Sequence, residues 1–166
     1  MDIAASTIDY LKQHQMTLTS AESCTAGKII TLVSEVPGGG ACIESGYVVY
    51  SPQAKQRLLG VRAYTIDTFN LTSCEVAREM AEGALRDSTA QVAVATTGLL
   101  GPDDMDGIPA GTICFAWAYR IGKTLSVFSR KERFTGGRED VQLQAALHAL
   151  RWLTHFHQRA LAGERG

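Results

Sequence analysis

Hydrophobic and polar positions along the first two thirds of the chain predict helices that alternate with strands. Apolar residues recur at helical spacing in some segments, and dense apolar runs of strand length stand between them. Ser51-Pro52 begins one helix, which closes at Gly60, and Pro37 with three glycines ends another. Helices are expected near residues 3–13, 29–36, 52–59 and 73–87, a short helix or turn near 65–71, and strands near 16–19, 42–50 and 91–96.

The last third of the chain predicts a β-hairpin followed by a helix. Two apolar segments, 112–119 and 124–134, flank the turn-forming tripeptide Ile121-Gly122-Lys123. One long helix is expected from Glu139 to about Ala160. The final residues, 163–166, are expected to fray.

This order of elements favours an α/β fold. Alternating helices and strands, followed by a hairpin, predict a three-layer α/β/α sandwich with a mixed, mostly parallel sheet of about five strands. The run Tyr47-Val48-Val49-Tyr50 looks too apolar for an edge strand, so its strand is expected inside the sheet. The length suits one core, and residues 1–166 show neither a repeat nor a linker, so a single domain is expected.

Composition narrows the classes of function. The net charge of −1 gives no electrostatic footprint for nucleic acid or an anionic membrane, and neither is expected as a partner. No apolar run could span a bilayer, and Met1-Asp2-Ile3 does not begin a signal peptide, so a cytoplasmic location is expected. The four cysteines form no C-x-x-C pair, which favours free thiols over disulfides or a zinc site. Neither a metal nor a cofactor is expected, because acidic residues clustered in one loop (103–106) are usually solvated.

The segment 19–27 carries the strongest candidate chemistry. It is a small, hydroxyl-rich turn between a strand and a helix, where backbone N–H groups point outward. Ser23 is a candidate nucleophile there, and the N–H groups around Cys24, Thr25 and Gly27 are candidate donors to an oxyanion. Taken alone, the segment is more typical of an ordinary helix cap by Ser23 or Thr25 than of a catalytic turn.

Five short motifs, standing in one order, resemble the CinA carboxy-terminal domain family. The motifs are Ala21-Glu22-Ser23-Cys24-Thr25, Val49-Tyr50-Ser51 with Lys55, Thr97-Gly98 with Gly101-Pro102, Gly111-Thr112, and Phe134-Thr135-Gly136-Gly137-Arg138. Each motif is weak by itself, but their shared order covers nearly the whole chain. The resemblance implies the family's stand-alone form, an amidohydrolase that converts nicotinamide mononucleotide to nicotinic acid mononucleotide and ammonia without a metal.

Serine chemistry on an amide needs a hydroxyl, a base and donors to the oxyanion. The resemblance implies catalytic roles for Ser23, Tyr50 and Lys55. Lys55 is the available base if burial lowers its pKa, because all four histidines fall on terminal helices. Tyr50 can relay a proton or orient the lysine. Without the family pattern, Lys55 is typical of a solvated lysine and Tyr50 of a core aromatic, while Cys24 remains a rival nucleophile.

The second half of the chain is expected to bind the nucleotide substrate. Thr97, Gly98 and Gly101 follow a strand, where the backbone can approach a ligand closely. Arg138 can pair with the phosphate in a bidentate manner. The ordinary alternatives are a plain turn and a surface cation. A homo-oligomer is expected, with a dimer favoured.

Two departures from the family pattern leave other functions open. Ala26 stands where the family usually has a second glycine, and Leu100 stands where it has a small residue, with Asp103-Asp104-Met105-Asp106 in place of a glycine-rich run. Leu100 could narrow the space over the ligand. One alternative is therefore a catalytically silent paralogue that binds a nucleotide or a partner protein. The hypothesis of a generic nucleotide-binding α/β protein is less favoured, because no phosphate-loop motif follows a strand.

Overall fold

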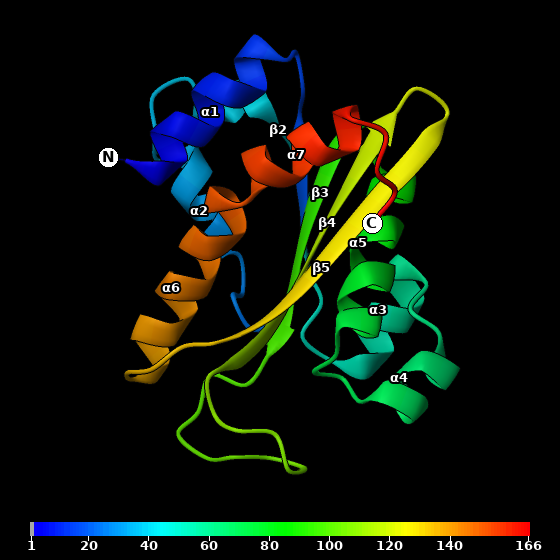
Figure 1. The fold of residues 1–166 in the computed structure, drawn as a ribbon. Helices are drawn as coiled ribbons and strands as arrows, with labels where there is room; N and C mark the ends of the chain where they lie inside the picture. The colour runs from blue at the N-terminus through cyan, green and yellow to red at the C-terminus, as the bar shows by residue number, and fades with distance from the viewer. Residues whose placement is uncertain (1) are drawn as a thin grey trace.

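The computed structural model describes residues 2–166, so Met1 lies outside the described residues. Figure 1 shows a central sheet with helices on both faces. The elements are α1 (Ile3–Gln13), β1 (Leu18–Glu22), α2 (Lys28–Ser34), the 3₁₀ helix η1 (Gly39–Cys42), β2 (Ile43–Val48), α3 (Pro52–Leu59), α4 (Ala63–Phe69), α5 (Cys74–Asp87), β3 (Val92–Gly98), β4 (Thr112–Ile121), β5 (Thr124–Arg133), α6 (Arg138–Arg151) and α7 (Leu153–Leu161).

The sheet has the strand order β2-β1-β3-β4-β5. β1 pairs in parallel with both β2 and β3, whereas β4 is antiparallel to β3 and to β5. Only β4 therefore runs against the other strands, and the predicted mixed, mostly parallel sheet is confirmed. In Figure 1, α1, α2, α6 and α7 cover one face, while α3, α4 and α5 lie against the other, which confirms the α/β/α layers.

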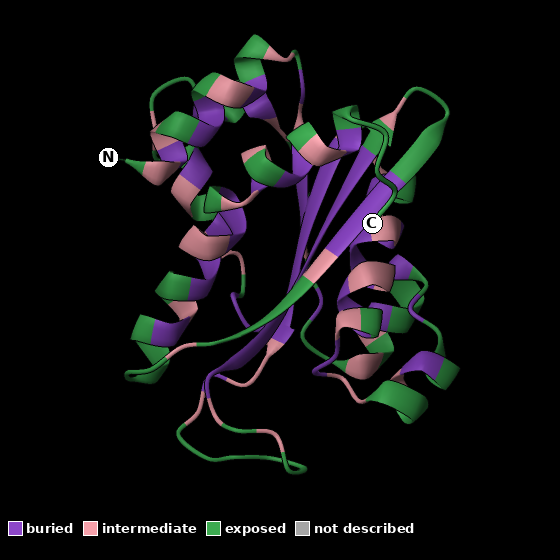
Figure 2. Cartoon of the chain, in the orientation of Figure 1, coloured by how far each residue is buried: buried purple, intermediate pink, exposed green. Residues whose placement is uncertain are grey.

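Two apolar clusters fill the space between the sheet and its helices. The larger cluster joins α1, α2, α6 and α7 to one face of the sheet, and it includes Trp117 and Tyr119. The second cluster, on the α5 face, is built largely from alanines of α5, β3 and β4. Figure 2 shows the central strands buried along their length, as expected for strands covered on both faces. In the described part of the chain, no helix is both long and apolar enough to cross a bilayer.

The prediction that the 42–50 strand lies inside the sheet is wrong. β2 is an edge strand, and its residues alternate between half-buried and exposed. The apolar run Tyr47–Tyr50 was misleading because the strand ends at Val48, whose side chain is 53% exposed. The chain then turns, so that Val49 enters the core and Tyr50 faces outward.

The C-terminal part of the chain also differs from expectation. The single long helix is divided at Trp152 into α6 and α7. Trp117 of β4 donates its indole N–H to the Ala149 carbonyl (2.8 Å), the acceptor that the Leu153 N–H would use in an unbroken helix. The last residues do not fray, because the Arg165 carbonyl accepts the Val127 N–H of β5 at 2.9 Å.

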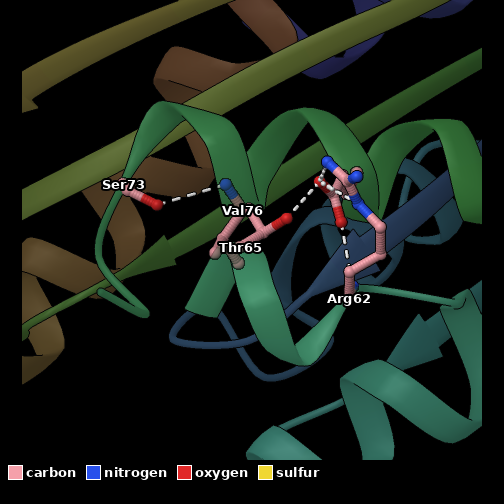
Figure 3. A network of polar contacts seen from close by, with 5 residues as sticks. Arg62, Thr65, Ser73 and Val76 are labelled. Carbon is pink, nitrogen blue, oxygen red and sulfur yellow. Dashed lines mark hydrogen bonds and ion pairs between the residues drawn. The ribbon is translucent and has the colours of Figure 1, made fainter. Parts of the chain in front are cut away.

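A polar network fixes α4 and α5 on the outer layer. Glu79 of α5 accepts from the backbone N–H and guanidinium of Arg62 and from the Thr65 hydroxyl (2.6 Å). Ser73 caps α5 by accepting the Val76 N–H at 3.1 Å. Figure 3 shows both sets of contacts. Glu79 therefore ties the start of α4 to α5, and Ser73 caps the N-terminus of α5.

Candidate active site

The turn after β1 lies at the carboxyl end of the parallel strands. β1 ends at Glu22 and α2 begins at Lys28, so Ser23 stands at the start of the connection. The Ser23 N–H donates to the Thr96 carbonyl of β3 (3.0 Å), which anchors the turn to the neighbouring strand. The Ser23 side chain is 7% exposed. This is the position where open α/β sheets bind their ligands.

Glu22 organises the turn, and sequence reasoning gave it no role beyond membership of a motif. Its carboxylate is fully buried and accepts hydrogen bonds from two hydroxyls and three backbone N–H groups. The donors are the hydroxyls of Ser20 and Thr25 and the N–H groups of Gly27, Ile29 and Ile30. Thr25 is also hydrogen-bonded to the Thr96 hydroxyl at 2.8 Å. The carboxylate thus takes up the free N–H groups of the α2 terminus and holds the turn in one shape.

Local sequence places Lys55 on the first turn of α3. Ser51 is the N-cap and accepts the Ala54 N–H at 3.0 Å, Pro52 occupies the first turn, and Gly60 closes the helix with φ +70°. The predicted helix is confirmed. Lys55 faces inward toward β1 instead of outward to solvent, and its side chain is only 1% exposed.

The Lys55 amine lies among three neutral oxygens. Nζ is 2.9 Å from Ser23 Oγ, 2.9 Å from the Val49 carbonyl and 3.2 Å from the Tyr50 carbonyl. Burial without a carboxylate partner lowers the pKa of Lys55 from 10.5 to about 8. When the amine loses a proton, two N–H bonds can stay on the two carbonyls. The lone pair is then left facing the Ser23 hydroxyl, the arrangement of a base next to a nucleophile.

Cys24 lies next to the nucleophile candidate but in a different environment. Its side chain is buried, and burial raises the pKa of the Cys24 thiol to about 12. A thiol with such a pKa carries almost no thiolate near neutral pH. The Cys24 carbonyl accepts the side-chain amide of Gln142 from α6 (3.1 Å), a contact that no local sequence signal indicated.

The turn leaves two N–H groups available as oxyanion donors. The Gly27 N–H is engaged by Glu22, and the Ala26 N–H donates to the Ser23 carbonyl. The N–H groups of Cys24 and Thr25 donate to no acceptor in residues 2–166. Ala26 adopts φ +51° and Gly27 φ +95°, which explains why glycines suit this turn.

Tyr50 approaches Lys55 through its backbone. Its carbonyl accepts from Lys55 Nζ, whereas its side chain is 58% exposed. The Tyr50 hydroxyl forms no hydrogen bond within the described residues, so its role as a proton relay stays a prediction. The side chain instead lines a pocket of about 370 Å³ with the loop that follows β3.

The glycine loop and Arg138 form the other side of this pocket. Gly98, Gly101 and Arg138 all line it, and an Arg138 guanidinium N–H donates to the Gly101 carbonyl. A side chain at Gly98 would meet the Thr112 carbonyl at 2.4 Å, so glycine is required by the close approach of β4. The Thr97 hydroxyl is used elsewhere, because it donates to the Leu71 carbonyl at 3.0 Å.

Two features of the glycine loop depart from the family pattern, Leu100 and the acidic residues of segment 103–106, and they have different surroundings. Leu100 is 8% exposed and packs into the larger core cluster, while it still borders the pocket. Among the acidic residues that follow, Asp104 accepts the Ala110 N–H at 2.8 Å and so supports the loop. Within residues 2–166, no three His, Cys, Asp or Glu side chains converge as metal ligands would.

Both the sequence and the fold of this chain are similar to those of known proteins. A sequence profile described as the CinA C-terminal domain matches residues 1–157. The nicotinamide-nucleotide amidohydrolase PncC of Enterobacter agglomerans is 40% identical over 141 residues, which cover 84% of this chain and 84% of that protein. A putative competence-damage inducible protein of Symbiobacterium thermophilum is 40% identical over 88% of this chain and 36% of its own length. The crystal structure of competence/damage inducible protein CihA from Agrobacterium tumefaciens has a TM-score of 0.88 at 33% identity, covering 95% and 96% of the two chains.

Proposed function

The chain belongs to the CinA C-terminal domain family, and we propose that it is an amidohydrolase acting on nicotinamide mononucleotide. The products are nicotinic acid mononucleotide and ammonia. The observation that carries this proposal is the buried pair formed by Lys55 and Ser23, with Nζ and Oγ 2.9 Å apart. Relatives named as nicotinamide-nucleotide amidohydrolases support the choice of substrate.

In the first half of the reaction, Lys55 acts as the base. Neutral Nζ takes the Ser23 hydroxyl proton while Oγ attacks the carboxamide carbon, and the carbonyl oxygen gains negative charge. The N–H groups of Cys24 and Thr25 stabilise that charge. The tetrahedral intermediate collapses as the Lys55 ammonium returns the proton to the amide nitrogen. Ammonia leaves, and an ester joins Ser23 to the nicotinate carbonyl.

In the second half, water hydrolyses the ester. Lys55 Nζ removes a proton from the attacking water, and the same two N–H groups stabilise the second tetrahedral intermediate. Ser23 Oγ leaves with the proton returned by Lys55. The carboxylic acid product loses its proton to solvent and dissociates as the carboxylate, and the site regains its starting protonation state.

Substrate recognition is assigned to the pocket of about 370 Å³ between Tyr50, the glycine loop and Arg138. Arg138 and the backbone at Gly98 and Gly101 bind the phosphate, while the exposed ring of Tyr50 forms a wall for the nucleotide. One domain for residues 1–166, a cytoplasmic location and a homo-oligomer, with a dimer favoured, are part of the same proposal.

The test is ammonia release from nicotinamide mononucleotide by matched variants. Ser23→Ala should abolish turnover while the circular dichroism spectrum is unchanged, and Cys24→Ala should keep most of it. Full activity in Ser23→Ala would refute the serine mechanism, and loss confined to Cys24→Ala would reassign the nucleophile. A wild-type chain that binds the nucleotide without releasing ammonia would favour the alternative, a silent nucleotide-binding paralogue.

A further inference from the structure

A pair of cysteines lies on the far side of the sheet from α2. Cys74 is the first residue of α5, and Cys114 is the third residue of β4, 40 positions later in the sequence. Both belong to the apolar layer between α5 and the sheet, where Cys74 packs against the cluster that contains Cys114. Cys114 is paired in register with Thr97 of β3, whose hydroxyl donates to the Leu71 carbonyl at 3.0 Å, so the segment that leads into α5 lies beside Cys114, and both cysteines are free.

The two thiols of this pair have unequal surroundings. Cys114 is fully buried, whereas Cys74 is only partly buried and is therefore reached from solvent. Lys131 of β5 stands opposite Cys114 in the strand register, and the Ser129 hydroxyl of the same strand accepts a hydrogen bond from Arg78 of α5 at 3.4 Å. The pair thus combines one accessible sulfur with one protected sulfur, beside a cation and a hydroxyl.

The same surroundings shift the pKa values of the two thiols in opposite directions. The neighbouring Cys114 thiol lowers the pKa of the Cys74 thiol, with help from Ser129 and the charge of Lys131, and against the effects of burial and Glu75. The neighbouring Cys74 thiol and burial raise the pKa of Cys114. An accessible thiolate beside a second thiol is the arrangement found at redox-sensitive cysteines.

The other two cysteines provide an internal comparison. Cys24 and Cys42 are buried and lie on separate elements of the chain. Burial raises the pKa of Cys24, and the Cys42 thiol lies 4.0 Å from the Ile8 carbonyl as a weak donor. Neither has an accessible sulfur next to a partner thiol, so reactivity is expected only at the Cys74–Cys114 pair.

We propose that Cys74 and Cys114 form a reversible oxidation site that reacts with hydroperoxides. The Cys74 thiolate attacks the terminal peroxide oxygen, the O–O bond breaks, and Cys74 becomes a sulfenic acid as water or an alcohol is released. The Cys114 sulfur then attacks the Cys74 sulfur, water leaves, and a disulfide forms. The two electrons lost by the thiols reduce the peroxide, and a dithiol reductant reverses the change.

A disulfide here would tie the start of α5 to the strand next to the substrate loop. Cys114 is paired in register with Thr97 of β3, and the Thr97 hydroxyl donates to the Leu71 carbonyl, three residues before Cys74. The bond would therefore close a ring across α5, β4 and the end of β3. The proposal rests on these contacts alone and does not depend on the amidohydrolase reaction.

The test uses the reduced full-length chain treated with a small excess of hydrogen peroxide. We expect intact mass to show the loss of two hydrogen atoms, a non-reducing peptide map to link Cys74 to Cys114, and dithiothreitol to reverse both. Cys114→Ser should stop at a Cys74 sulfenic acid, which dimedone traps. Cys74→Ser should remain unoxidised under the same conditions, and Cys42→Ala should behave like the wild type.

Two results would overturn the proposal. One is a wild-type chain in which Cys74 accumulates oxygen atoms without any cross-link to Cys114. The other is preferential oxidation of Cys24 or Cys42. Because Cys114 is buried, its serine variant can lose stability, and Cys114→Ala then serves in its place. The wild-type peptide map decides the matter even if both variants unfold.

Discussion

The protonation of Lys55 should set the pH dependence of turnover. Burial lowers its pKa from 10.5 to about 8, and the reaction needs the neutral amine. With that pKa, about a tenth of the enzyme is active at pH 7, about half at pH 8 and about nine tenths at pH 9. Because the neutral form lies on the high-pH side, kcat/KM should rise roughly tenfold from pH 7 to pH 9 and then level off.

The assay is initial-rate ammonia release measured at low substrate concentration between pH 7 and pH 10. The substrate phosphate does not interfere, since its second pKa is about 6. Lys55→Arg should remove turnover at every pH because arginine keeps its proton, and Lys55→Met should do the same without a charge. A flat profile, or a rise that continues past pH 9 toward an ordinary lysine pKa, would refute the role of a buried base.

Four further substitutions test the rest of the site. Leu100→Ala should destabilise the protein by about 2–3 kcal/mol in chemical denaturation, because it opens a cavity in the core, and it should not raise turnover. Ala26→Gly should raise the unfolding free energy by roughly 0.5–1 kcal/mol, since it relieves a left-handed alanine, and an unchanged denaturation midpoint would contradict this. Arg138→Ala should raise KM for the mononucleotide roughly tenfold to hundredfold with a smaller change in kcat, and equal activity on the riboside would exclude the phosphate contact. Tyr50→Phe should keep most activity if Tyr50 acts through its carbonyl and ring, and a large loss of kcat would support the proton relay instead.

Local signals in the sequence determined most of the secondary structure. The helix α3 follows from Ser51, Pro52 and Gly60, whose conformational preferences act within a few residues. The hairpin follows from two apolar segments around Gly122, and the layered fold follows from the alternation before it. Short motifs also identified Ser23 and Lys55, but as resemblances to a family and not as neighbours in space.

Tertiary structure decided the features that depend on contacts between distant residues. Thirty-two positions separate Ser23 from Lys55, and only the folded chain, in which α3 packs against α5, brings the two residues together, buries the lysine and shifts its pKa. The break between α6 and α7 has no proline or glycine, and it coincides with the contact from Trp117 of β4.

Contacts between distant residues also decide where the side chains of Glu22, in the turn after β1, and Leu100, in the glycine loop, point. Glu22 accepts five hydrogen bonds only once the chain up to residue 30 folds back over the end of β1. Leu100 enters the core cluster that also contains apolar residues of α6, which periodicity in an irregular segment cannot indicate. Propensities act over a few residues, whereas burial and hydrogen-bond partners are properties of the assembled layers.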